Sequence, residues 1–249
     1  MKFTVLTNVF NEEYLLPFWL EHHRKIFDHG IVIDYRSTDS SMDIVRKMCP
    51  TWEIRTTRNT HFCAHEIDTE FMDIESELDG YKMVLNTTEF LITREDIRSL
   101  VLDDVNKAYA IQCLVACSKK EDIYPETLPE LFGGIERVQT ENRGMRLLHS
   151  FPHGHYSVGR HIVTLPLTAF IPAYISWFGF YPWNNRLLAR KLQIKNNIPE
   201  CDRRNGAGFQ HFWETEEQVK QRDIYASESV PLTDVPALTD CLKRAMETL

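Results

Sequence analysis

Segments with the apolar spacing of strands and of helices alternate along the first 95 residues of the chain. The strand-like stretches are short and rich in β-branched residues, whereas the stretches between them place side chains such as Leu16, Trp19 and Leu20 at helical spacing. The pattern predicts strands at 2–9, 31–33, 52–57 and 81–85, and helices at 12–26, from 37–39 to 48, and at 64–78. Right-handed crossovers of this kind build an open, mostly parallel α/β sheet, whose ligand crevice lies beyond the carboxyl ends of its strands.

The second half has a less regular pattern. It predicts strands at 107–117 and 145–150, a turn or short helix at 125–132, and helices at 186–194 and 214–224. The His- and Gly-rich stretch 151–161 and the Pro-broken aromatic stretch 166–183 predict an irregular surface or lid. No repeat or linker interrupts the chain, so we expect a single domain, 1–249, with a nucleotide-binding half at 1–95 and a C-terminal elaboration at 96–249.

Composition narrows the class of protein further. The formal charge of -8, from 28 Lys and Arg against 36 Asp and Glu, argues against nucleic acid as a main partner. The six cysteines form no Cys-x-x-Cys pair and are expected to be reduced thiols. No export signal and no apolar run of transmembrane length is visible, so the sequence predicts a cytoplasmic protein without a transmembrane segment.

Polar residues stand where the predicted strands end. Asn8, Asp34 and Asn86 each follow a strand, and the stretch 8–13 then opens a helix whose backbone amides could face an anion or a nucleobase. That stretch has no glycine, which excludes the dinucleotide fingerprint and the P-loop. The alternative is a plain helix start capped by Asn11. Asp34 and Asp39 could accept from a ribose hydroxyl or a pyrimidine imide, although helix capping is the preferred interpretation of Asp39.

Histidines and aromatic residues have structural interpretations as well. His149, His153, His155 and His161 are interleaved with Pro and Gly, which favours an irregular loop at the site of an acceptor over a metal site. His22 and His23 are expected to be structural. The aromatic run at 177–183 could stack on sugar rings, but core packing is the default expectation.

Three segments together resemble a known family. NEEYLLPFWLEHH at 11–23, HGIVIDYRSTDSS at 29–41 and LNTTEFLI at 85–92 occur in order after successive strands. They resemble a family-2-like glycosyltransferase of the GT-A fold, in the branch whose members read NE, D-x-x-S-T-D and D-x-D-E-F. The later segments GHYSVGRH at 154–161 and GFQHFWETEEQVKQR at 208–222 are similar to the His-containing C-terminal part of such enzymes.

The resemblance implies a Rossmann-like GT-A nucleotide-diphospho-sugar transferase fold. It implies transfer of a sugar from a UDP-linked donor to a hydroxyl of a glycan or lipid-linked acceptor, as in polysaccharide biosynthesis, with the acceptor bound by the second half and peripheral membrane association open. Asn8, Asn11 and Glu12 would line the uridine side of the pocket, and Asp34 would contact the base. The other donor-site candidates are Asp39, Asn86, Thr88 and Arg160.

A departure from the motif concerns the metal. Asn86 and Thr88 stand where the family has two aspartates, and Thr88 brings no charge to a divalent cation. A departing nucleoside diphosphate needs its charge stabilised, by a hard cation or by cationic side chains. Glu89 and His211 are therefore the candidate ligands for Mn²⁺ or Mg²⁺, and Arg160, His161, Arg203 and Arg204 are the alternative donors.

The sequence offers several candidates for the catalytic base and more than one function. An inverting transfer needs a carboxylate near the acceptor hydroxyl, and Glu136 is the candidate, with Glu141, Asp122 and Glu130 as alternatives. Two other functions fit the sequence: a non-catalytic relative that binds a nucleotide sugar, which Thr88 favours, and another nucleotide-binding α/β protein. Donor sugar, acceptor, linkage and stereochemical outcome are not predicted.

Overall fold

A mixed sheet forms the centre of the protein. The computed structural model describes residues 1–118, 121–141, 144–160, 164–206, 208 and 211–247. Its first half contains β1 (Phe3–Val9), β2 (His29–Asp34), β3 (Glu53–Thr56) and β4 (Tyr81–Val84). β1 lies between β2 and β4, β2 pairs with β3, and all three pairings are parallel. The α/β fold class predicted from the sequence is confirmed.

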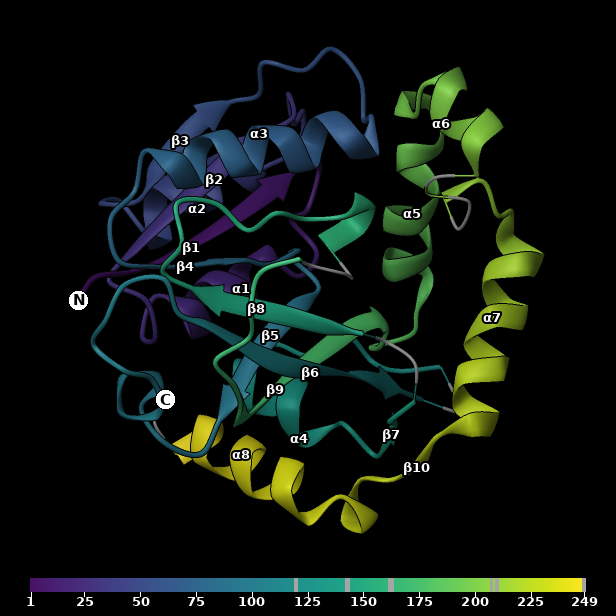
Figure 1. Cartoon of the computed structure of the whole chain (residues 1–249). Helices are drawn as coiled ribbons and strands as arrows, with labels where there is room; N and C mark the ends of the chain where they lie inside the picture. Colours follow the sequence, from purple (N-terminus) through teal and green to yellow (C-terminus); the bar gives the residue numbers. More distant parts are fainter. Residues whose placement is uncertain (119–120, 142–143, 161–163, 207, 209–210, 248–249) are drawn as a thin grey trace.

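Helices cover both faces of this parallel part, as Figure 1 shows. They are α1 (Leu16–His23), α2 (Ser41–Met48) and α3 (Ala64–Ser76). Because neighbouring residues of a strand point to opposite faces, Val5 packs with α1 and α2 while Leu6 packs with Phe71 of α3. Near-continuous apolar runs such as 31–33 are therefore buried on both sides.

The second half extends the sheet with mostly antiparallel strands. They are β5 (Glu89–Thr93), β6 (Ala108–Cys117), β7 (Arg137–Gln139), β8 (Met145–His149), β9 (Ala169–Phe180) and β10 (Val230–Pro231). β8 joins the halves by pairing antiparallel with β4 and β6, and β9 pairs with β5 and β6 off this path. The order of the main path is β10-β7-β6-β8-β4-β1-β2-β3.

The remaining helices lie at the edges of the molecule. They are α4 (Leu128–Gly133), α5 (Asn185–Gln193), α6 (Glu200–Asn205), α7 (Thr215–Glu228) and α8 (Pro236–Glu247), with short 3₁₀ turns that include Val158–Arg160. In Figure 1, α5, α6 and α7 stand along one side and α8 lies below the sheet. α5 begins at the residue after Asn184, whose side chain accepts hydrogen bonds from the amides of Arg186 and Leu187.

The prediction of an irregular segment at 166–183 is wrong for most of its length. β9 runs through it, with Ile171, Ala173 and Ile175 buried at every second position. Pro172 is exposed and lies where the register between β6 and β9 shifts, so the strand tolerates a residue without an N–H donor. The default expectation for the aromatic run holds for Phe178, which is fully buried in the core.

Gly30 is the position in β2 where a side chain does not fit. A Cβ atom there would lie 2.1 Å from the ring of Trp52. We expect Gly30→Ala to destabilise the protein by about 1–3 kcal/mol, because the ring must move within a packed core. Urea unfolding measures this, with Gly133→Ala as control, where the nearest atom is 3.9 Å away. Equal stability of the two variants would show that the Trp52 ring is free to shift.

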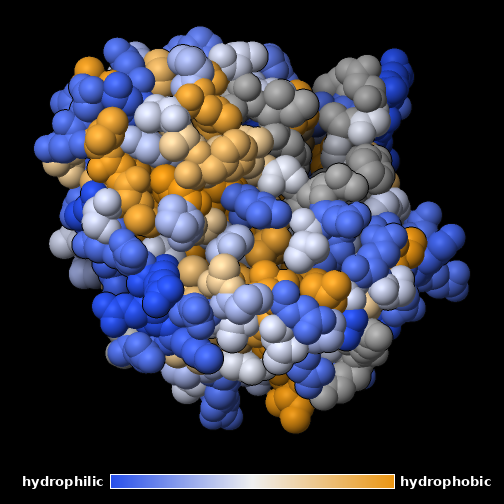
Figure 2. Space-filling model, turned by 60° about the horizontal axis from the view of Figure 1, so that its bottom comes forward, coloured by the Kyte–Doolittle hydropathy of each residue, from blue (hydrophilic) through white to orange (hydrophobic). Residues whose placement is uncertain are grey.

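Large apolar side chains that stay exposed include Val105, Leu167 and Phe170. Figure 2 shows hydrophobic residues gathered over a broad area of one face, bordered by hydrophilic ones. No helix within the described ranges combines the length and the apolar character needed to cross a membrane. Peripheral membrane association stays a prediction.

Candidate functional site

A cavity of about 580 Å³ opens beyond the carboxyl ends of β1 and β4. The loop after β4, the start of α3, the turn at Val158–Arg160, β9, α5 and α7 supply its walls. This is the crevice that an open α/β sheet leaves for a ligand. Of the residues predicted to form the site, the cavity is lined by Asn8, Glu12, Asn86, Thr88, Arg160 and His211.

Two predicted residues, Asn11 and Asp34, make contacts within the adjoining loops instead. The Oδ1 atom of Asn11 accepts from the amide of Thr38 at 2.8 Å, and that of Asp34 accepts from Ser37 at 2.8 Å. α1 begins after Leu15, with no side-chain cap, so the prediction of Asn11 as its cap is wrong. Neither Asn11 nor Asp34 is among the described residues that line the cavity.

Asp39 lies one residue before Ser40, the N-cap residue of α2, and binds the first amide of that helix. Its Oδ1 atom accepts from the amide of Ser41, the first residue of α2, at 2.9 Å, and its Oδ2 atom accepts from the amide of Glu13 at 3.1 Å. The side chain therefore ties the start of α2 to the loop after β1. It is absent from the described lining of the cavity, so we do not retain it as a donor-site residue.

Glu12 faces the cavity in an ion pair with α5. Its carboxylate accepts from Nε of Arg190 at 2.5 Å and from Nη2 at 2.7 Å, a bidentate contact. The neighbouring Gln193 donates its Nε2 to the carbonyl of Asn11 at 2.8 Å. α5 is thereby attached to the loop that precedes α1.

Glu89, predicted as a metal ligand, lies beneath the cavity in a buried ion pair. Arg146 donates to its two oxygens from Nη2 at 2.6 Å and from Nε at 2.9 Å, and Asn86 donates its backbone and side-chain nitrogens at 3.0 and 3.2 Å. Both partners of the pair are almost completely buried. Burial alone would lower the pKa of Arg146, but the charge and hydrogen bonds of Glu89 raise it. With both oxygens engaged, Glu89 does not fit a metal ligand.

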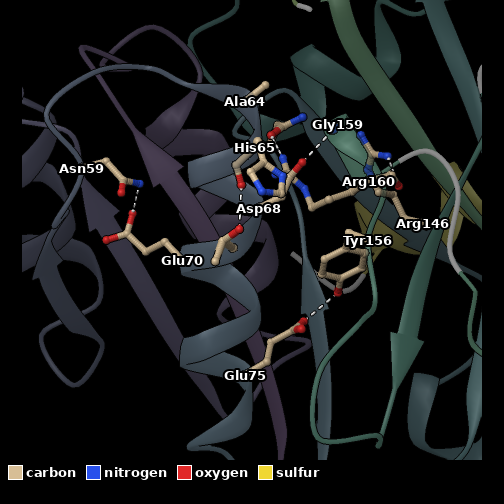
Figure 3. A network of polar contacts seen from close by, with 12 residues as sticks. Asn59, Ala64, His65, Asp68, Glu70, Glu75, Arg146, Tyr156, Gly159 and Arg160 are labelled. Carbon is tan, nitrogen blue, oxygen red and sulfur yellow. Dashed lines mark hydrogen bonds and ion pairs between the residues drawn. The ribbon is translucent and has the colours of Figure 1, made fainter. Parts of the chain in front are cut away.

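Three of the carboxylates of α3 contact three different partners, as Figure 3 shows. Glu70 accepts from Asn59, Glu75 accepts from Tyr156, and Asp68 forms an ion pair with Arg160. Only Asp68 lines the cavity. The contacts of Glu75 with Tyr156 and His149 are buried and structural, as is the pairing of Glu70.

Aromatic side chains form another wall of the cavity. Trp177, Phe180 and Tyr225 line it, and Trp177 donates its indole N–H to Oγ1 of Thr88 at 3.1 Å. Nζ of Lys191 lies 3.8 Å from the centre of the Phe180 ring. Core packing, the default expectation for the aromatic run, is therefore incomplete at Trp177 and Phe180, which also face the cavity.

His211 and the late arginines differ in position. Burial, together with the nearby charges of Lys191 and Arg190, lowers the pKa of His211 to about 4, so its imidazole is neutral at neutral pH. Arg203 and Arg204 are exposed on α6 and lie outside the described lining. His161 lies outside the described residues. A neutral imidazole can donate to or accept from a ligand in the cavity.

The donor set at the cavity does not fit a divalent cation. Mn²⁺ and Mg²⁺ prefer carboxylate and water oxygens, yet Asn86 and Thr88 are neutral. The lining carboxylates are Glu12, paired with Arg190, Asp68, paired with Arg160, and Asp202, which accepts from the amide of Ala64 at 2.7 Å. Within the ranges that the structure describes, no three His, Cys, Asp or Glu side chains come together as a metal site.

The predicted base Glu136 lies away from the cavity. It is exposed next to the start of β7, and its carbonyl accepts from the amide of Leu232 at 2.9 Å. It is not part of the described lining, so a role in proton transfer at this cavity would need another group. Asp122, a second candidate, is used structurally, because its Oδ2 atom accepts from the amide of Trp183 at 2.7 Å.

Sequence reasoning missed five charged residues of the cavity: Asp68, Arg146, Arg190, Lys191 and Asp202. For two of them, Asp68 and Arg146, the sequence contains a pattern that could have indicated a buried charge. Asp68 falls three residues before Phe71 on the buried side of a predicted helix, and Arg146 interrupts an apolar strand. A charge inside an apolar pattern needs a buried partner, and such partners often mark a site.

Comparison with known proteins gives likenesses of fold only. No protein-family model matches the chain, and no curated protein matches it. Among solved structures, TarS 1–349 from S. aureus in complex with UDP-GlcNAc is 15% identical, with a TM-score of 0.38, and the match covers 60% of this chain and 45% of that one. Glucosyl-3-phosphoglycerate synthase from Mycobacterium tuberculosis, in complex with Mn²⁺, UDP and glucosyl-3-phosphoglycerate, is 13% identical, with a TM-score of 0.33 and coverage of 46% and 44%.

A third match, 4-diphosphocytidyl-2C-methyl-D-erythritol synthase, is 13% identical with a TM-score of 0.33, and covers 60% of this chain and 72% of that one. The chain spans less than half the length of the TarS and glucosyl-3-phosphoglycerate synthase structures that it matches. TarS and glucosyl-3-phosphoglycerate synthase are among the matches, in agreement with the motif resemblance to GT-A glycosyltransferases, but the matches are partial and no statement on function rests on them. The function proposed below rests on the residues of the chain itself.

Proposed function

We propose that the protein is a glycosyltransferase that takes its sugar from a nucleotide-sugar donor, UDP-linked, and passes it to a hydroxyl of a glycan or related acceptor. The observation that supports this most is the cavity at the carboxyl ends of β1 and β4. Its lining includes Glu12, Asn86 and Thr88, from two of the three motif segments, together with Asn8 at the end of β1. A volume of about 580 Å³ is adequate for a ligand of nucleotide-sugar size.

Polar and aromatic side chains of the cavity suit such a donor. The side-chain amide of Asn8 offers a donor and an acceptor to a base, a ribose or a sugar hydroxyl. Trp177 and Tyr225 also line the cavity and offer apolar rings, on which the faces of sugar rings pack. Both rings come from the second half of the chain.

Asn8 gives the sharpest test of donor binding. It lines the cavity at the end of β1 and has no side-chain hydrogen bond within the described residues, so its replacement leaves the fold intact. We expect Asn8→Ala to weaken the binding of UDP by about threefold to tenfold, the value of one hydrogen bond. Calorimetric titration measures it, with the exposed Asn185→Ala as control. Unchanged UDP affinity in Asn8→Ala would contradict the proposed pocket.

A second candidate function is binding of a nucleotide sugar without turnover. It is favoured by the engagement of Glu12, Asp68 and Asp202, because none of these lining carboxylates is placed as a general base. Donor hydrolysis and transfer to a panel of glycan acceptors distinguish the two. UDP-sugar binding with neither reaction would favour the second candidate, and release of UDP would favour the first.

A further inference from the structure

Arg160 lines the cavity and is fixed there by contacts with Asp68, Asn86 and Phe71. Its Nη1 atom pairs with Asp68, its Nη2 atom donates to Oδ1 of Asn86 at 2.7 Å, and its guanidinium lies over the ring of Phe71, 4.8 Å from the centre. The residue is 6% exposed, yet it lines the cavity. Its φ of 59° is in the left-handed region, which a non-glycine residue adopts only where the surroundings hold it.

The Nε atom of this guanidinium has no hydrogen-bond partner among the described residues. A buried donor without a partner is costly because it has lost its hydrogen bonds to water, so a ligand acceptor that reaches it from the cavity would be bound more tightly. Guanidinium N–H groups favour anionic oxygens, those of phosphates above all. The unpaired atom therefore indicates an anionic ligand next to Asn86.

The guanidinium of Arg160 lies at the part of the sequence that departs from the D-x-D-E-F motif. Asn86, which accepts from Arg160, stands where the resemblance implies the first aspartate of a metal-binding pair, and Thr88 stands at the second. The lining carboxylates are engaged with Arg160, Arg190 and the amide of Ala64. A guanidinium therefore lies beside the position at which a divalent cation would be expected.

We propose that Arg160 holds the diphosphate of the donor in place of a divalent cation, through the N–H of Nε. Asp68 and Asn86 are positioning residues that orient the guanidinium. Lys191, on the aromatic wall, brings a further positive charge to the same cavity. This inference rests on the proposed function, because it assumes that the anionic ligand is a nucleoside diphosphate.

The test separates the phosphate contribution from that of the base. UDP and uridine are titrated by calorimetry into the full chain in EDTA and again in Mn²⁺. We expect UDP to bind at least about tenfold more tightly than uridine in EDTA, as one charged hydrogen bond allows. Adding Mn²⁺ is expected to leave this ratio unchanged.

Two variants are chosen so that neither leaves an uncompensated charge in the buried pair, which keeps the protein folded. Arg160→Lys keeps a charge opposite Asp68 and removes the Nε donor, and the double variant Asp68→Asn with Arg160→Gln removes both charges of the buried pair together. We expect the ratio of UDP to uridine affinity to fall about tenfold in both variants. Arg58→Gln is the matched control, because Arg58 also pairs with an aspartate of α3, Asp73, but at the exposed surface.

The binding results distinguish the role of Arg160 from the proposed function. UDP binding that requires Mn²⁺ overturns the role of Arg160 and leaves the proposed function standing. Binding in EDTA that is unchanged in both Arg160 variants also overturns that role. If neither UDP nor uridine binds the folded wild-type chain in either buffer, the proposed function itself fails.

Discussion

Replacing Arg146 by methionine is expected to destabilise the protein by about 3–5 kcal/mol, because it leaves the carboxylate of Glu89 buried without its counter-charge. The pair is enclosed under the cavity, with the two side chains 2% and 1% exposed. Arg146 also donates from Nη1 to the carbonyl of Arg160 at 2.9 Å, so its loss loosens the turn that carries the proposed phosphate-binding residue.

Urea unfolding at neutral pH measures this effect, and a second variant separates charge from packing. In the double variant Glu89→Gln with Arg146→Met the uncompensated charge is absent, so most of the lost stability should return. Arg46→Met is the control, because Arg46 pairs with Asp43 at the surface and should change stability by less than about 0.5 kcal/mol. A loss for Arg146→Met as small as that of the control would show that solvent reaches Glu89.

The second large effect is a loss of stability in mild acid that depends on His22. Burial lowers the pKa of His22 from 6.5 to about 4, despite the hydrogen bond that its Nε2 atom makes with the carbonyl of Leu91 at 2.6 Å. Burial also holds the pKa of His23 well below its ordinary value. Its Nδ1 atom contacts the carbonyl of Trp19, while its Nε2 atom accepts from the amide of Leu91, an arrangement that requires the neutral ring.

Because the unfolded chain binds a proton at His22 below pH 6.5 and the folded chain does not until about pH 4, stability is complete above pH 6.5 and falls between these values. The loss is on the order of 3 kcal/mol for this one residue. His22→Gln keeps a donor for Leu91 without titrating, so its stability should depend less on pH over this range. Urea unfolding between pH 7 and pH 4 checks this, with the exposed His61→Gln as control. Identical pH profiles for wild type and His22→Gln would rule out the buried neutral imidazole as the cause.

The parallel half of the sheet could be predicted from the sequence because its signals are local. The apolar stretch at 31–33 and the helical spacing of Leu16, Trp19 and Leu20 determine element type within a few residues. Helix starts were less predictable. Asn11 has the residue type of a cap, but its side chain accepts from Thr38 across the loop, a contact that no local pattern contains.

The charged part of the cavity depends on pairs that are distant in sequence. Glu12 and Arg190 are 178 residues apart, Asp68 and Arg160 are 92 apart, and Glu89 and Arg146 are 57 apart. The carboxylates alone favoured a metal or a base, as predicted for Glu89. Their engagement with arginines became visible only with the tertiary structure, which also placed Glu136 outside the described lining.

In all three ion pairs the acidic residue precedes the arginine in the sequence. In each, the acid comes from the first 89 residues and the base from residue 146 or later. A fragment that stops after β5 would keep the three acids and lack every compensating base, so mutual repulsion and unscreened burial would oppose its folding. The two halves are thus electrostatically interdependent, and the three acids of the first half all have their counter-charges only once Arg190 has been synthesised.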